Sequence, residues 1–261
     1  SNTLNRSPVA GRRLLGRSRL STAEWWPTIR VMKVDPFVHD ALAQRVIFGS
    51  GTRLQVADIV ADLTADKADA SVFVIVSGSA AAAAEPAVES LVERLGGGAV
   101  AVWTEVVQHV PIELADRARA AVDAAAADVV VAIGGGSAIG LAKAIALTHR
   151  IAIVAVPTTY AGSEQTAIYG LTGDRHKQTG SDPVVLPTVV VYDPDLTLDL
   201  PPAVTGPSAF NALAHSVEAL YAPGHNPVTS LFALEGVRAI AASLPAAMRD
   251  PADLDARATL L

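Results

Sequence analysis

The sequence predicts an α/β fold in which a parallel-sheet domain is followed by an all-helical domain. From residue 45 onward, strand-sized apolar runs alternate with helix-like segments, and helices dominate after Pro207. The strand-sized runs are apolar at nearly every position, as expected when helices cover both faces of a parallel sheet. These observations favour an α/β class over an all-helical or all-β chain.

The sheet elements follow one another in a regular order. Apolar runs predict strands at residues 45–49, 71–77, 99–107, 128–133 and 151–156. Helical periodicity predicts the intervening helices at residues 54–63, 81–95, 111–126 and 137–148. The strand–helix alternation therefore extends to residue 156.

The rhythm changes after Thr158. Short extended pieces at 167–171 and 189–192, joined by Gly, Asp and Pro turns, predict a loop-rich hairpin region. Helices are expected at 208–221, at 228–242 and from about Ala252.

Three segments divide the chain. We expect the α/β domain at 32–195 and an incomplete helical domain at 196–261, because the sequence ends within a helix-like pattern without a stop signal. Residues 1–31 have neither helical nor strand periodicity and are expected to be a disordered or upstream extension.

Composition restricts the function. The 261 residues are 51% hydrophobic and 18% charged, with a formal net charge of −6. This charge argues against nucleic-acid binding, and no apolar run approaches the roughly 20 residues of a membrane helix. The absence of cysteine excludes disulfides and thiolate catalysis and suits a cytoplasmic location. A small-molecule ligand is expected.

A glycine-rich turn follows the predicted strand 128–133. Gly134, Gly135 and Gly136 lead into a helix, with Ser137 expected as its N-cap. Glycines bring backbone N–H groups close to an anion, and a helix N-terminus favours negative charge, so a pyrophosphate site is indicated. Ile139 stands where the third glycine of the strict dinucleotide fingerprint would fall. A tight turn without a ligand is the alternative.

A second polar loop follows the next predicted strand. It carries Thr158, Thr159 and Ser163, and it lies at the carboxyl end of a parallel strand, where α/β proteins bind ligands. The alternative is that these hydroxyls only satisfy the loop backbone.

Motifs downstream of these loops resemble a known family. They are Lys177-Gln178-Thr179, Asp182–Pro187, Tyr192–Thr197 and Asn211–Tyr221. In this order they resemble the iron-containing alcohol dehydrogenases, and within them the maleylacetate reductases. The resemblance implies a dinucleotide-binding domain, a helical domain, and reduction of maleylacetate to 3-oxoadipate with NADH or NADPH in the breakdown of aromatic compounds. It also implies a homodimer.

The resemblance also implies roles for particular residues. Gly134, Gly135, Gly136 and Ser137 match the pyrophosphate loop; the cofactor-binding set is completed by Thr158, Thr159, Ser163 and Lys177. The implied catalytic residues are Lys177, His215 and Asn211. A dicarboxylate substrate needs cations, for which Lys177 and Arg175 are candidates. The glycines of 48–52 match a first turn that borders the cofactor.

The helix motif bears on metal binding. Asn211, His215 and Glu218 share one helical stripe. In metal-dependent relatives an aspartate stands at the position of Asn211, and a neutral amide is a poorer ligand for iron or zinc. No metal is therefore expected. The alternative for His215 is a histidine at the edge of a helix core, with a buried face built by Phe210, Leu213, Ala214 and Val217.

Two other functions stay open. One is a metal-dependent alcohol dehydrogenase of the same fold. The other is a truncated, non-catalytic nucleotide-binding module that exposes an apolar helical patch.

Overall fold

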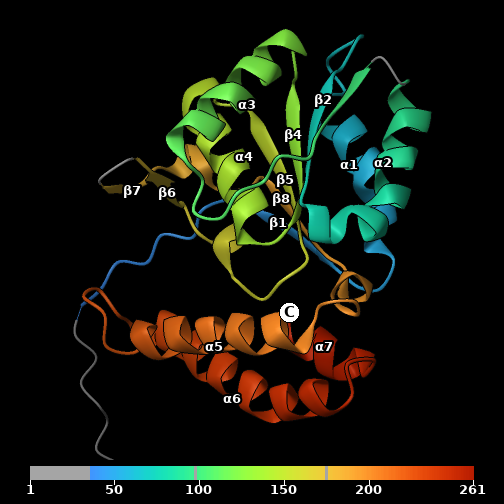
Figure 1. Cartoon of the computed structure of the whole chain (residues 1–261). Coiled ribbons are helices and arrows are strands. Elements are labelled where there is room, and N and C mark those ends of the chain that lie inside the picture. Colours follow the sequence, from blue (N-terminus) through green and yellow to red (C-terminus); the bar gives the residue numbers. More distant parts are fainter. Residues whose placement is uncertain (1–35, 97–98, 174–175) are drawn as a thin grey trace, which may run out of the picture. The chain divides into compact units, whose positions relative to one another are not determined.

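The computed structural model describes residues 36–96, 99–173 and 176–261. The chain divides into two compact units, residues 1–36 and 37–261, and the second holds all the described helices and strands. In it a parallel sheet with helices on both faces precedes a helical region, which confirms the predicted fold class (Figure 1). The expectation for residues 1–31 lies outside the described residues.

The sheet has six strands among the described residues, in the order β1-β8-β5-β4-β2-β3. All neighbouring strands pair in parallel. Their bounds are Arg45–Phe48 (β1), Val72–Val76 (β2), Val100–Trp103 (β3), Val129–Gly134 (β4), Ala152–Pro157 (β5) and Val189–Tyr192 (β8). The central strands β2, β4 and β5 are almost completely buried, which explains their apolar sequences.

Alternate residues of these strands enter two separate cores. Phe73 and Ile75 of β2 pack with α3 (Ile112–Ala124) and α4 (Gly136–His149). The intervening strand residues pack with α1 (Val56–Leu63) and α2 (Ala81–Leu95). Figure 1 shows the two helix pairs on opposite sides of the sheet. Both pleat faces are covered, so neither needs polar residues.

The interpretation of residues 189–192 as part of the hairpin region was wrong. They form β8, which lies between β1 and β5 in the main sheet. All four residues are buried, as in the other central strands. The antiparallel hairpin consists of β6 (Ile168–Thr172) and β7 (Lys177–Ser181).

Three helices form the helical region: α5 (Pro202–Ala219), α6 (Pro227–Arg249) and α7 (Leu254–Leu260). The helices α5 and α6 are longer than predicted because Pro207 and Pro245 lie inside them and do not end them. The predicted buried face of α5 was wrong in part: Phe210 is 61% exposed and Val217 43% exposed, whereas Leu213 packs against the helical core beside the buried Ala209.

Helix α6 has a large apolar surface. By length and composition alone it could cross a membrane, the one such helix among the described residues. It packs against both α5 and α7. Its side chains Leu231, Phe232 and Leu234 are exposed.

A buried arginine connects α7 to the loop after β5. The Arg257 side chain has no exposed surface. Its guanidinium donates to neutral oxygens only among the described residues: Tyr160 Oη (3.2 Å), Thr205 Oγ1 (3.2 Å), Leu200 O (3.3 Å) and Pro251 O (2.8 Å). Because every nitrogen of this buried cation has an acceptor, its desolvation cost is offset.

The turn between β4 and α4 leaves no room for side chains. Gly134 has φ of 154°, and an added Cβ would lie 2.6 Å from Ser77 Oγ and 2.9 Å from Ala138 Cβ. At Gly135 the same atom would lie 3.0 Å from Thr159 Cγ2. Glycine is therefore required for β2, β4 and β5 to end close together.

The crowding at Gly134 predicts a large effect of one methyl group. Gly134→Ala should lower the free energy of unfolding by about 3 kcal/mol, because it adds both a backbone strain and a steric clash. Urea unfolding measures the change. Gly78→Ala is the matched control, since its added Cβ meets nothing within 4 Å. Equal stability of the two variants would contradict the steric argument.

Candidate functional site

The carboxyl ends of β2, β4 and β5 meet at one edge of the sheet. The chain continues from β2 to β3 on one side and from β4 to β5 on the other, so the strand order reverses between β2 and β4. Open α/β sheets bind ligands in the crevice at such a point. Ser77 lies there and donates its N–H to Ile133 O (3.1 Å).

Sequence reasoning missed the segment after β2. Ser77, Gly78 and Ser79 follow a buried apolar strand. Small residues directly after a buried apolar strand are the same pattern that identified the turn at Gly134. This pattern could have identified the segment after β2 as part of the site.

The first turn of α4 offers free donors. Helix α4 begins at Gly136 with Gly135 as its N-cap, and no side chain caps it. The predicted N-cap role of Ser137 was therefore wrong, because the N-cap lies two residues earlier, at Gly135. The N–H groups of Gly136 and Ser137 have no acceptor among the described residues. Such groups, at the positive end of a helix dipole, suit a phosphate.

Two adjoining cavities lie beside this turn. One of about 450 Å³ is lined by Gly136, Ser137, Ser163, Lys177 and Asn211, among others. The other, of about 610 Å³, shares Ser163 and Lys177 and adds His215. The structure thus brings all three predicted catalytic residues, from the hairpin and from α5, to one pair of cavities.

Four predicted cofactor residues line neither cavity. Thr158 N donates to Gly134 O (3.1 Å), and the Thr159 side chain packs against Gly135. These residues join the ends of β4 and β5. Arg175, the other cation considered for the substrate, lies outside the described residues.

The cavity walls carry basic side chains, and none of their described residues is acidic. Lys143 and His109 line the smaller cavity, His215 lines the larger, and Lys177 lines both. No described lining residue of either cavity is Asp or Glu. In a chain with a formal charge of −6, this is a local reversal of sign that favours an anionic ligand.

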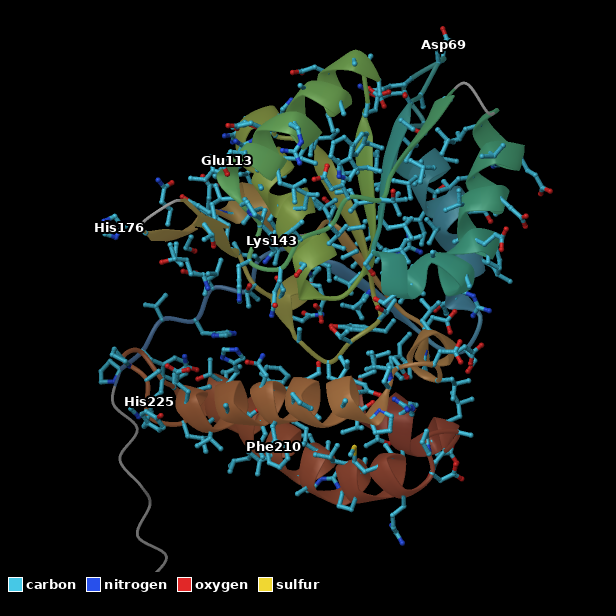
Figure 2. All side chains as sticks on the ribbon, viewed as in Figure 1. Asp69, Glu113, Lys143, His176, Phe210 and His225 are labelled. Carbon is cyan, nitrogen blue, oxygen red and sulfur yellow. The ribbon has the colours of Figure 1, made fainter. Side chains whose placement is uncertain are left out.

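Lys143 fixes the loop that forms one wall, and sequence reasoning missed it. It is fully buried on α4. Its Nζ donates to Ser163 O (2.5 Å), Thr166 O (2.7 Å), Thr166 Oγ1 (3.1 Å) and Ile168 O (2.9 Å). Burial lowers the pKa of Lys143 to about 8, against an opposing effect of Glu164. The ammonium is thus charged at neutral pH and holds residues 163–168 against α4. Figure 2 labels Lys143 on this helix.

A buried carboxyl group lies in the same loop. Glu164 is 3% exposed; its Oε1 accepts from Tyr192 Oη (2.8 Å), and its Oε2 has no partner. Burial raises the pKa of Glu164, while Tyr192 and Lys143 act in the opposite direction. Gln165 Nε2 donates to Tyr192 Oη (2.9 Å) and Gln44 Nε2 to Glu164 O (2.9 Å). This network connects the loop to β8.

The described residues do not form a metal centre. On α5, His215 and Asn211 are exposed, and His215 Nδ1 lies 3.8 Å from Glu218 Oε2. No group of three or more His, Cys, Asp or Glu that could hold a metal occurs in the described part of the chain. One imidazole, a carboxylate and an amide make an incomplete donor set for iron or zinc.

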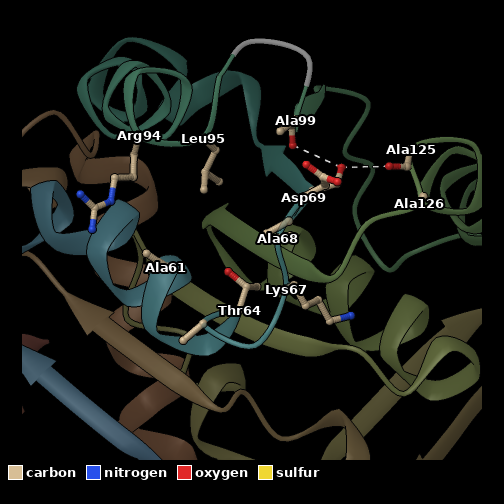
Figure 3. A pocket seen from close by; sticks show the side chains of 13 residues that line it. Ala61, Thr64, Lys67, Ala68, Asp69, Arg94, Leu95, Ala99, Ala125 and Ala126 are labelled. Carbon is tan, nitrogen blue, oxygen red and sulfur yellow. Dashed lines mark hydrogen bonds between the residues drawn. The ribbon is translucent and has the colours of Figure 1, made fainter.

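A third cavity, of about 600 Å³, lies at the opposite edge of the sheet (Figure 3). Two of its polar residues are bonded to neighbours: Lys67 is paired with Asp128, which also accepts from Ser71 N (3.0 Å), and Ser71 Oγ donates to Ala125 O (2.9 Å). These residues precede or connect the strands β2 and β4. We therefore assign them to holding the strand starts together.

The sequence matches two parts of one protein family. Residues 43–194 match the family described as iron-containing alcohol dehydrogenase, and residues 205–261 match the C-terminal part of the Fe-containing alcohol dehydrogenase family.

Curated relatives include maleylacetate reductases. The chain is 46% identical over 225 residues to the maleylacetate reductase of Sphingobium indicum, covering 86% of this chain and 61% of that protein. It is 57% identical over 155 residues to maleylacetate reductase 2 of Cupriavidus pinatubonensis, covering 59% of this chain and 43% of that protein. The chain thus spans about three-fifths or less of the length of these relatives.

Solved structures show the same fold. The maleylacetate reductase of Agrobacterium tumefaciens matches with a TM-score of 0.79 at 40% identity, covering 87% of this chain and 62% of that one. A sulfoacetaldehyde reductase of Bifidobacterium kashiwanohense, solved in complex with NAD+, matches with a TM-score of 0.77 at 24% identity. The match covers 87% of this chain and 64% of that one. The second likeness concerns the fold alone.

Removing the ammonium of Lys143 should release the loop. Lys143→Met leaves three carbonyl groups without a donor, so we expect a loss of about 2–3 kcal/mol in stability. Amide exchange at residues 163–170 should accelerate at least tenfold, while that of β5 changes little. Lys67→Met, at an exposed lysine, is the control and should leave this exchange unchanged. Uniform acceleration throughout the chain would contradict a local role.

The buried carboxyl group predicts a pH dependence. As pH rises, the unfolded chain loses the Glu164 proton first, so between its ordinary pKa of 4.5 and the raised folded value the folded state binds more protons. Stability should fall with rising pH in that interval. Glu164→Gln cannot titrate, so it should gain stability relative to wild type across the interval, measured by urea unfolding. Unfolding free energies of wild type and Glu164→Gln that change in parallel with pH would contradict this. The control is Glu113→Gln, which replaces an exposed carboxyl group on α3.

Proposed function

The chain belongs to the iron-containing alcohol dehydrogenase family, and from that premise we propose that it forms the coenzyme domain and part of the substrate cleft of a maleylacetate reductase. The reaction proposed is reduction of maleylacetate to 3-oxoadipate with NADH or NADPH, in the breakdown of aromatic compounds. One observation carries the choice of substrate class: cations and neutral donors line the two cavities without a described acid. A dicarboxylate suits such walls better than a neutral alcohol does.

The start of α4 is the proposed coenzyme site. The free N–H groups of Gly136 and Ser137 would hold the pyrophosphate, beside Ser77 and the polar loop after β5. The end of β5, about 20 residues after the glycine turn, carries no acidic residue at Pro157–Thr159, and an acid there would select the ribose of NADH. Both NADH and NADPH therefore stay in the proposal.

Lys177, Asn211 and His215 are the proposed catalytic residues. The reduced nicotinamide, when bound, supplies the hydride for the electron-poor carbon–carbon double bond of the substrate. The Lys177 ammonium would bind one carboxylate of the substrate and so hold it beside the nicotinamide. His215 would deliver a proton, directly or through water, and Asn211 would orient the substrate by hydrogen bonds.

The proposal includes no metal. It is supported by the amide at position 211 and by the incomplete donor set on α5. Elemental analysis of purified protein tests this point, and stoichiometric iron or zinc would instead favour the metal-dependent alcohol dehydrogenase. A cytoplasmic homodimer is part of the proposal for the intact enzyme.

A second candidate is a nucleotide-binding module without turnover. It is favoured by the exposed apolar side chains of α6, which mark a surface for a partner. The two candidates share the coenzyme site and differ in catalysis.

Titration with NADH tests the shared site. We expect enhanced NADH fluorescence and a higher melting temperature, since a ligand at 100 times its Kd adds about 2.7 kcal/mol of stability. Unchanged fluorescence and melting of folded protein with NADH and also with NADPH would contradict both candidates. Oxidation of NADH on addition of maleylacetate favours the reductase, whereas binding without oxidation favours the module. Lys177→Ala should lower any turnover at least tenfold without weakening NADH binding comparably.

A further inference from the structure

The loop between β3 and α3 contains an unusual backbone. His109 has φ of 65° and Val110 has φ of 46°. Positive φ is uncommon outside glycine and exceptional for a β-branched residue such as valine. Arg150, with φ of 52°, caps the end of α4, which is an ordinary place for this conformation. His109 and Val110 instead precede a helix, so capping does not explain them.

Contacts from two elements hold this turn. Thr172, the last residue of β6, donates its Oγ1 to His109 O (2.8 Å) and its N–H to Val110 O (3.0 Å). The Val110 side chain is 3% exposed and packs against α4, where an added Cβ on Gly140 would lie 3.1 Å from it. The turn is therefore fixed by the hairpin and the core. Strain that is maintained in this way clusters at ligand sites.

The turn places its polar side chains at the smaller cavity. Gln108 and His109 line it together with Lys177 and Asn211, which come from β7 and α5. The His109 side chain is exposed, and no described residue forms a hydrogen bond with its ring. Val110 occupies the buried side of the turn, which leaves the histidine on the open side.

The available charge in the cavity is limited. The Lys143 ammonium is already bonded to four oxygens of the loop. Among the described lining residues, this leaves Lys177 and His109 as the side chains that can bring a positive charge to a ligand. A dicarboxylate has two charged ends. One cation accounts for only one of them.

We propose that His109 is a specificity-determining residue that binds the second carboxylate of a dicarboxylate ligand, with Lys177 binding the other end. This assignment rests on the proposed function, whose catalytic set does not include His109. An imidazole donates an N–H to a carboxylate in either protonation state and adds charge when protonated. The strained turn fixes the backbone from which the His109 side chain leaves at the cavity wall, which reduces the ordering needed on binding.

The test compares two acids of equal length. Adipate and hexanoate have six carbons each and differ in one carboxylate. Their Kd values are measured by calorimetry on the chain, with and without saturating NADH. His109→Ala should raise the Kd for adipate at least tenfold and change the Kd values for hexanoate and NADH by less than twofold. His109→Gln, which keeps an N–H donor, should recover part of the loss.

Two further variants separate binding from folding. His225→Ala removes an exposed histidine that lines neither cavity and should change no Kd. Thr172→Val removes the hydroxyl group that bonds to His109 O, and it should weaken adipate binding in the same direction with a smaller effect. Melting temperatures of all variants report whether they are folded.

The outcomes distinguish this assignment from the proposed function. Unchanged adipate affinity in folded His109→Ala, or equal weakening of adipate and hexanoate, would overturn the role of His109 and leave the coenzyme site intact. Wild-type protein that binds NADH but not adipate would overturn both the substrate class and this role. Wild-type protein that binds adipate but neither NADH nor NADPH would overturn the proposed function, and the variants would still test His109.

Discussion

The hydrogen bonds of the Lys143 ammonium are the constraint on which the rest of the site depends. A charge buried inside α4 needs acceptors, and the three carbonyl groups of the loop after β5 supply them. This interaction fixes Ser163 beside the start of α4 and sets the point from which β6 leaves the domain. The hairpin then carries Lys177 back to the same cavities. A single side chain thus holds together parts of the site that are far apart in sequence.

Much of this arrangement could be predicted from the sequence. The uniformly apolar strands and the Gly134–Ser137 turn identify the sheet and the edge at which ligands bind, because burial on both faces leaves little choice of residue. The spacing of Asn211 and His215 places both on one stripe of α5, and the structure brings them to cavities shared with Lys177. The roles of these residues stay predictions.

Other features depend on contacts that the sequence does not display. A lysine on a helix is ordinarily exposed, so nothing marks Lys143 as buried until the loop that accepts its hydrogen bonds is in place. Residues 189–192 are surrounded by turns, and only pairing with β1 and β5 identifies them as a central strand. Phe210 looks like a core residue by its type. Its exposure is determined by which helix faces pack together.

Arg257 has a consequence for how the C-terminal end of the described chain behaves. Its bonds to Tyr160 and Thr205 cross 97 and 52 positions of sequence and end in the loop after β5 and in α5. Detaching α7, which has seven residues, would remove the Arg257 donors from the Tyr160 and Thr205 hydroxyl groups. It would also leave a cavity where the guanidinium is packed. We therefore expect α7 to open together with that loop as one cooperative unit. We expect a ligand that orders the loop after β5 to reduce the opening of α7 as well.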